Sequence, residues 1–184
     1  MKKLFIFCLI SIPVFAADIT IIVSPKLSIE KHNKIAVFFE EEKSKYNQAD
    51  QGDVSAFFSS VEAEFMRLGF NVIDRNHINK ILAEHQFSQS GIVSSDNAIE
   101  AGKILGTNAI VVLKYSGRSS VAFSAQMRMV DIETAAVLIT ANFSGGGVSD
   151  SRHSIVNIIS VASRKTPADV AKLFFEQIKE QLKK

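Results

Sequence analysis

The chain has 184 residues, 47% of them hydrophobic, and a formal charge of +2 from 21 basic and 19 acidic side chains. This small charge gives no electrostatic reason to expect a nucleic-acid ligand, because phosphate binding needs a concentration of basic residues. A chain of this length can bury roughly 70% of its unfolded surface around one core.

The first residues have the organisation of a secretory signal peptide. Lys2 and Lys3 precede an apolar run at residues 4–12, and Val14 and Ala16 suit a cleavage site. We expect cleavage after Ala16, which leaves 19 basic and 19 acidic residues in a periplasmic chain. An uncut anchor at residues 1–16 is the alternative, although this run is short for a bilayer core of about 30 Å. No later stretch reaches the ~18 apolar residues of a membrane span.

Cysteine chemistry is absent from the expected mature chain. Cys8 is the only cysteine, and it lies inside the apolar run without a lipobox. The mature chain therefore has no disulfide, no thiolate metal site and no cysteine nucleophile.

The next elements expected are two strands and a loop. Residues 17–33 form an N-terminal arm, or a strand at residues 19–23 that ends before Pro25. Residues 34–40 contain a continuous apolar run, which is typical of a strand covered on both faces. The polar stretch Glu40–Gly52 predicts a loop of about a dozen residues.

Three helices and a short strand follow. Asp53 is expected to cap an amphipathic helix that ends at Gly69, with Glu62, Glu64 and Arg67 on its solvent side. A short strand occupies residues 70–73, and Asp74 caps a second helix over residues 75–86. Ser94 or Ser95 starts a third helix that stops at Gly106. The buried face of the first helix should comprise Val54, Phe57, Phe58, Val61, Phe65 and Leu68.

The last part of the chain predicts three strands and a helix. Strands are expected at residues 108–115, 119–132 and 136–143, with a tight turn at 131–134 where Asp131 bonds its own downstream backbone. Residues 153–162 fit a helix or a strand equally well. Thr166, Pro167 and Asp169 form a capping box at the final helix. The order β-β-α-β-α-α-β-β-β-α predicts a single α/β domain with a mixed sheet flanked by helices.

Two glycine-containing stretches resemble nucleotide loops only superficially. In "AGKILGT", Gly102 lies inside the predicted helix, and Ile104 stands where a phosphate loop needs serine or threonine. We expect Ala98, Ala101 and Gly102 to let this helix approach a neighbour closely. Residues 145–147 lack the dinucleotide-binding pattern and predict a loop. No cofactor is expected.

The sequence supports no catalytic or metal site. His77 and His85 are too far apart on one helix for one metal ion, and Glu40–Glu42 fit a solvated strand end. No serine lies in a nucleophile elbow and no acid–base pair can be nominated. We expect no small-molecule substrate and no pocket lined by converging polar groups. An unrecognised hydrolase is the remaining enzymatic alternative.

Two stretches are better candidates for binding a protein partner. The loop from residue 41 to 52 carries Tyr46, Asn47 and Gln48, and the apolar stretch 153–162 follows a glycine hinge. An ordinary loop and an ordinary core segment are the alternatives. The candidate partner-binding residues are Tyr46, Asn47, Gln48, Ile155, Ile158 and Ile159.

Many positions of the chain match one family pattern. They are Gly69-Phe70, Val72-Ile73-Asp74-Arg75, Ile81-Leu82, Glu84-His85-Gln86, Ser90-Gly91, Ala98, Gly102, Leu105-Gly106 and Ile110-Val111-Val112. The hairpin stretch "MRMVDIETAAVLIT" resembles the same pattern, with Ala135 at the usual turn glycine. From about residue 34 to residue 143, together with the closing helix, the sequence is therefore similar to the CsgG-type family of curli secretion channels and its FlgO-like and LpoB-like relatives. This resemblance would make residues 34–184 a CsgG-like domain.

The resemblance implies a non-enzymatic envelope protein on the inner side of the outer membrane. Its departures are the missing lipobox cysteine and the missing membrane hairpins, because residues 145–165 are charged and lack long apolar alternation. We therefore expect a periplasmic interaction or scaffold module with envelope-protein partners and only peripheral membrane contact. The alternative is a subunit that self-associates into the ring of an outer-membrane export channel.

Overall fold

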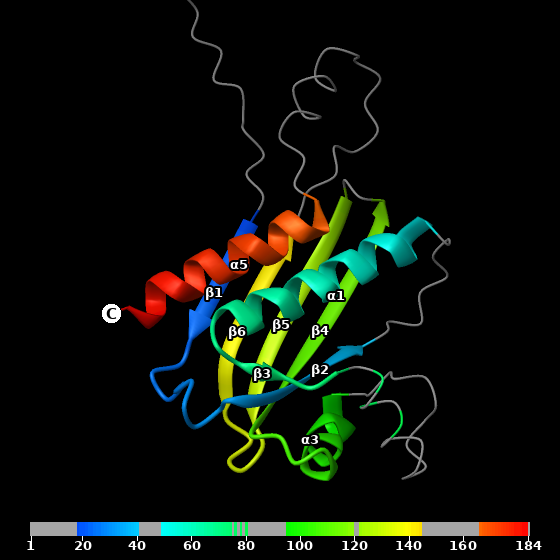
Figure 1. Ribbon diagram of the computed structural model, residues 1–184. Coiled ribbons are helices and arrows are strands. Elements are labelled where there is room, and N and C mark those ends of the chain that lie inside the picture. The colour runs from blue at the N-terminus through cyan, green and yellow to red at the C-terminus, as the bar shows by residue number, and fades with distance from the viewer. Residues whose placement is uncertain are drawn as a thin grey trace, which may run out of the picture.

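The computed structural model describes residues 18–40, 49–74, 76, 78, 80, 95–119, 122–144 and 166–183. It confirms a single α/β domain with one mixed sheet (Figure 1). Six strands lie in the order β1-β6-β5-β4-β2-β3. They are β1 (Asp18–Val23), β2 (Lys34–Glu40), β3 (Asn71–Val72), β4 (Ala109–Ser119), β5 (Ala122–Asp131) and β6 (Val137–Ser144).

The sheet combines parallel and antiparallel pairs. β2 lies parallel to β3 and β4, whereas β4, β5, β6 and β1 are successively antiparallel. Four consecutive residues of β2, from Ile35 to Phe38, are buried, which confirms a strand covered on both faces. In β5, Phe123, Ala125, Met127 and Met129 are buried while Gln126 and Arg128 are exposed, which confirms the predicted alternation.

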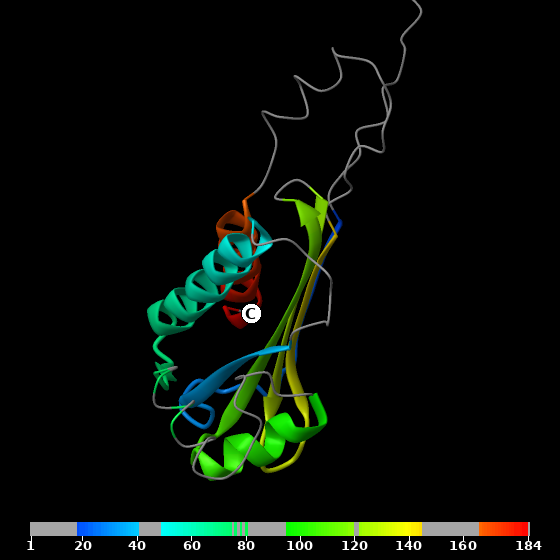
Figure 2. The same ribbon diagram turned by 90° about the vertical axis from the view of Figure 1, so that its right-hand side faces the viewer.

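Two long helices cover one face of the sheet. Figure 2 shows α1 (Ala49–Arg67) and α5 (Pro167–Leu182) side by side on that face. Phe65 of α1 meets Phe175 of α5 edge to face, with ring centroids 4.7 Å apart. Each buried side chain of this size contributes about 1.5–3 kcal/mol, so this layer holds the main core together.

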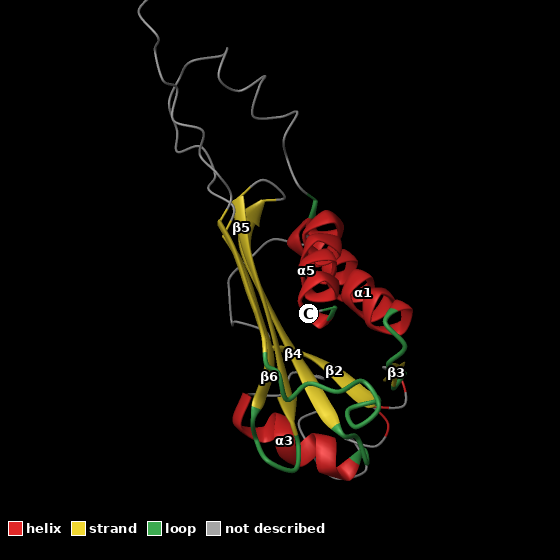
Figure 3. Ribbon diagram, turned by 90° about the vertical axis from the view of Figure 1, so that its left-hand side faces the viewer, coloured by secondary structure: helices red, strands yellow, loops and turns green. Residues whose placement is uncertain are grey.

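The third helix, α3 (Ser95–Ile104), lies against the opposite face near the start of β2 and β4 (Figure 3). A Cβ atom on Gly102 would lie 2.5 Å from Ile132 Cδ1 and 2.6 Å from Ile110 Cγ2. This confirms the expected close approach at Gly102. Gly106 ends the helix with φ of +61°, a conformation that glycine adopts without strain.

Two of the expected capping signals are present. Thr166 and Asp169 form the predicted capping box at α5, with Pro167 at its first turn. Asp74 Oδ1 accepts a bond from the Asn76 backbone at 2.9 Å, and residues 76, 78 and 80 are helical. The rest of the predicted helix over 75–86 lies outside the described residues. None of the described helices combines the length and apolar character needed to cross a bilayer.

Two details of the first helix differ from expectation. It begins at Ala49, so residues 49–52 belong to the helix and Asp53 lies inside it instead of at its cap. Glu64, expected on the solvent side, is only 6% exposed. Its carboxylate bonds Arg67 on the same helix and lies 3.4 Å from Lys179 Nζ of α5. Helix α5 therefore covers a position that the periodicity of α1 alone assigns to solvent.

Candidate functional site

The carboxyl end of the sheet is the end at which β2, β4 and β6 finish. Both segments predicted to bind a partner follow strands that finish there, one after Glu40 of β2 and the other after Ser144 of β6. The pairing places Glu40 of β2 beside Lys114 of β4, then Gln126 of β5 and Asn142 of β6. β6 ends at Ser144, two residues beyond this row. Figure 1 shows α1 and α5 starting near this end. The described residues that flank stretches 41–48 and 145–165 therefore lie toward the same end of the domain.

This end rests on a packed aromatic layer. Tyr115 stacks on Phe123 at 5.1 Å between ring centroids, and Phe123 lies 4.9 Å from Phe143. Phe57 of α1 contacts Tyr115 and also Phe174 of α5, at 6.2 Å in each case. Such ring pairs contribute about 0.5–1.5 kcal/mol beyond the burial of their area. The segments therefore leave from a rigid base.

Among the described residues, an ion pair between β2 and β4 lies at this end. Lys114 Nζ lies 2.8 Å from Glu40 Oε1, and the lysine side chain is 49% exposed. The candidates Tyr46, Asn47, Gln48, Ile155, Ile158 and Ile159 lie outside the described residues, so their roles stay predictions.

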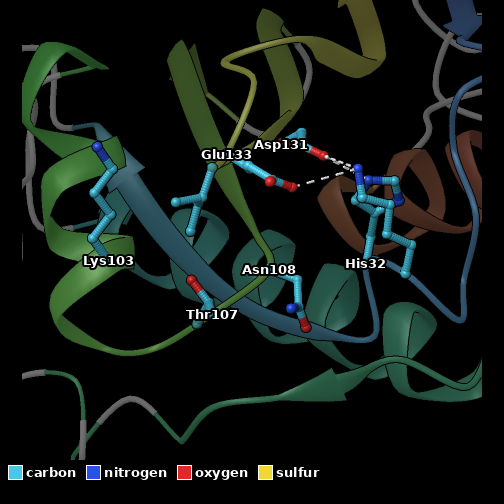
Figure 4. Close-up of a pocket in the computed structure, with 8 residues that line it drawn as sticks. His32, Lys103, Thr107, Asn108, Asp131 and Glu133 are labelled. Atoms are coloured by element: carbon cyan, nitrogen blue, oxygen red, sulfur yellow. Dashed lines mark hydrogen bonds and ion pairs between the residues drawn. The ribbon is translucent and has the colours of Figure 1, made fainter.

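The amino end of the sheet holds a cavity of about 390 Å³. It is lined by polar groups, so the expectation that no such pocket exists is wrong. Figure 4 shows that the side chains around it come from the β1–β2 connection, α3, the start of β4 and the β5–β6 turn, with His32, Asp131 and Glu133 close together. The lining residues are Lys31, His32, Lys103, Thr107, Asn108, Asp131, Ile132 and Glu133.

A buried histidine–aspartate pair forms one wall of this cavity. His32 is 1% exposed and Asp131 is 3% exposed, and Nε2 of the ring lies 2.8 Å from Oδ2 of the carboxylate. The other ring nitrogen, Nδ1, lies 3.1 Å from the Ser28 backbone nitrogen and 2.9 Å from the Ser28 carbonyl oxygen. A neutral ring can accept from the first group and a protonated ring can donate to the second, so Nδ1 has a partner in both states.

The Asp131 carboxylate is held in its charged form. Oδ1 accepts bonds from the Thr134 backbone N–H at 2.7 Å and the Thr134 hydroxyl at 3.0 Å, which confirms the predicted turn. Lys31 Nζ lies 3.5 Å from Oδ2. Burial alone would raise the pKa of Asp131, but the bonds from Thr134 and His32, with the Lys31 charge, hold that pKa well below its ordinary value.

These contacts leave the pair without the geometry of a catalytic site. A general base needs a ring nitrogen within reach of substrate, and here the protein occupies both nitrogens of a fully buried ring. Among the described residues, the Thr134 hydroxyl donates to the Asp131 carboxylate, and no hydroxyl group bonds the His32 ring. The described residues also contain no cluster of three metal-ligating side chains.

Sequence reasoning missed the His32–Asp131 contact because 99 residues separate the two positions. The only signal was the turn at residues 131–134, which predicted that the carboxylate bonds its own backbone. The turn explains the bonds to Asp131 Oδ1, but it predicts no partner for Oδ2.

No family model and no curated protein matches the chain. Among solved structures it is similar to a lipoprotein from Neisseria meningitidis, with 14% identity and a TM-score of 0.49 over 71% of this chain and 92% of that one. It is similar to the LpoB C-terminal domain from Salmonella enterica, with 14% identity and a TM-score of 0.47 over 61% and 81%. The PelC dodecamer from Paraburkholderia phytofirmans gives 13% identity and a TM-score of 0.45 over 84% and 94%.

Proposed function

We propose that the chain is a non-enzymatic periplasmic module that binds envelope proteins in a secretion, flagellar or wall-synthesis assembly, with the CsgG-type organisation that its sequence resembles. The observation that carries this proposal is the arrangement at the carboxyl end. Both predicted binding stretches leave the sheet there, on a base of packed aromatic rings.

The amino end supports a non-enzymatic role. Asp131 bonds both His32 and Thr134 there and pairs with Lys31, so these polar groups serve to join the β1–β2 connection to the β5–β6 turn. Partner contact then falls to residues 46–48 and to Ile155, Ile158 and Ile159. The chain binds neither nucleic acid nor a small-molecule substrate in this proposal, and meets the membrane only peripherally.

Site-specific photo-cross-linking in the periplasm tests this function. A cross-linking amino acid replaces Asn47, Ile158 or, as the matched control at the opposite end, the exposed Lys103. We expect adducts with the same envelope protein from positions 47 and 158 and none from position 103. Adducts from position 103 alone, or no envelope protein from any position, would contradict the proposal.

A further inference from the structure

Strand β1 forms one edge of the sheet, and its backbone groups divide into two sets. The Ser24 N–H donates to the Leu138 carbonyl of β6 at 2.8 Å, and residue 24 is therefore bonded toward β6. Backbone groups of successive strand residues point to opposite sides, so Ile22 and Thr20 are also bonded toward β6. The N–H and C=O groups of Ile19, Ile21 and Val23 point away from the sheet.

One side chain of helix α5 covers this edge at Ile21 and Val23. Gln181 Nε2 donates to the Ile21 carbonyl at 3.1 Å, and Gln181 Oε1 accepts from the Val23 N–H at 3.1 Å. One amide thus supplies the donor and acceptor that a neighbouring strand would supply. Covering an edge in this way is how proteins limit unwanted strand pairing.

The rest of the edge, at Ile19 and the N–H of Ile21, has no bond from the described part of the chain. The Ile21 carbonyl retains a second lone pair. The strand itself carries β-branched residues from Ile19 to Val23 and no lysine or proline that would oppose pairing. Ile22 is 63% exposed on the face of the sheet away from α1 and α5.

We propose that a second copy of the chain docks on this open edge, with β1 paired antiparallel to β1 about a two-fold axis at Thr20. Ile19 of each copy then stands opposite Ile21 of the other, and each of these residues donates its N–H to the carbonyl of its counterpart. The two-fold axis matches every open donor with an open acceptor, because both copies present the same groups. Cleavage after Ala16, as the sequence predicts, would leave one residue before Asp18.

Gln181 sets the strength of this pairing. While its amide occupies Val23, the ladder cannot extend past Ile21, and the contact is far smaller than the 1,200–2,000 Å² or so of a stable interface. The dimer is therefore weak and depends on concentration. This pairing is independent of the partner-binding function proposed above, because that function uses residues 46–48 and 155–159.

Sedimentation equilibrium of the mature chain, residues 17–184, tests the pairing. We expect a reversible monomer–dimer equilibrium between about 10 μM and 1 mM, tightened about three- to tenfold by Gln181→Ala, which frees Val23 for one more bond per copy. Thr20→Lys and Thr20→Glu should each abolish the dimer, because like charges then face each other at the axis. An equimolar mixture of these two variants should restore it. Thr20 is exposed, so both variants should keep the fold, which circular dichroism checks.

Three results would overturn the proposal. One is a chain that stays monomeric up to about 1 mM even as Gln181→Ala. Another is an oligomer whose mass does not change with charge at position 20. The third is a monomer whose Ile19 and Ile21 amides gain hydrogen-exchange protection only when another envelope protein is added, which would assign the edge to that protein. In each case the cross-links from positions 47 and 158 report on the proposed function separately.

Discussion

The two ends of the sheet use polar residues in different ways. At the amino end, Asp131 bonds both His32 and Thr134, and the histidine and aspartate are fully buried. At the carboxyl end, the ion pair between Glu40 and Lys114 is partly exposed, with the lysine side chain 49% and the glutamate side chain 24% exposed. A buried pair is costly to break, whereas a solvated pair contributes little.

This difference indicates a division of labour within the domain. Polar groups at the amino end fix how the β1–β2 connection and the β5–β6 turn meet. The carboxyl end is held by aromatic packing between the sheet and α1, and its Glu40–Lys114 pair stays partly exposed. Stability should therefore respond strongly to changes at the amino end, and partner binding to changes at the carboxyl end.

Removal of the buried carboxylate should have the largest effect. Asp131→Ala leaves a buried imidazole and the Thr134 N–H without their partner, which should lower the free energy of unfolding by about 3–5 kcal/mol. Urea denaturation measures this loss. Glu133→Ala is the matched control, because Glu133 is 81% exposed and should change stability by less than about 1 kcal/mol. Equal losses in both variants would remove the distinction between buried and exposed groups.

The same carboxylate should make stability sensitive to acid. The folded pKa of Asp131 lies below its unfolded value of about 4, so the charged form stabilises the fold above that pH. This contribution is lost as the pH falls through the lower folded value. We expect wild type and Asp131→Asn to differ by a constant free energy of unfolding above about pH 5 and to converge below about pH 4. A difference that stays constant down to about pH 2 would contradict the lowered pKa.

A methyl group at the contact between α3 and the sheet should have a smaller effect. In Gly102→Ala the new Cβ meets Ile110 and Ile132, and overpacking of about 1–3 kcal/mol exceeds the helix-propensity gain of about 1 kcal/mol. We expect a net loss of about 1–2 kcal/mol by urea denaturation. Gly52→Ala in α1 is the control, because no heavy atom lies within 4 Å of its added Cβ, and it should stabilise by about 0.5–1 kcal/mol.

The success of sequence prediction also differs with the range of the interactions. Gly106, the capping box at Thr166 and the alternation of β5 depend on neighbouring residues, and each was predictable. The burial of Glu64 depends on α5, more than 100 residues away, and the periodicity of α1 could not show it. The His32–Asp131 contact has the same origin. The candidate binding residues lie outside the described part of the chain and remain sequence-based predictions.

The β5–β6 turn offers a small gain in stability. Ala135 has φ of +56°, a left-handed conformation that strains residues other than glycine by about 1–2 kcal/mol. Ala135→Gly relieves this strain but increases the entropy of the unfolded chain by about 0.4–1 kcal/mol. We expect a net gain of about 0.5–1 kcal/mol in thermal or urea unfolding. A loss of stability would show that packing of the Ala135 methyl outweighs the strain.

The smallest effect should come from the ion pair at the carboxyl end. Lys114→Gln removes a charge that lies 2.8 Å from Glu40, yet the lysine is half exposed and such pairs contribute about 0.2–1 kcal/mol. Because exposed charges are screened by salt, the loss should shrink further when the unfolding is repeated in about 1 M salt. The loss from Asp131→Ala should keep most of its size at the same salt concentration, since its carboxylate is 4% exposed. Matching salt dependence at the two positions would show that both ends are equally solvated, and the contrast between them would then not hold.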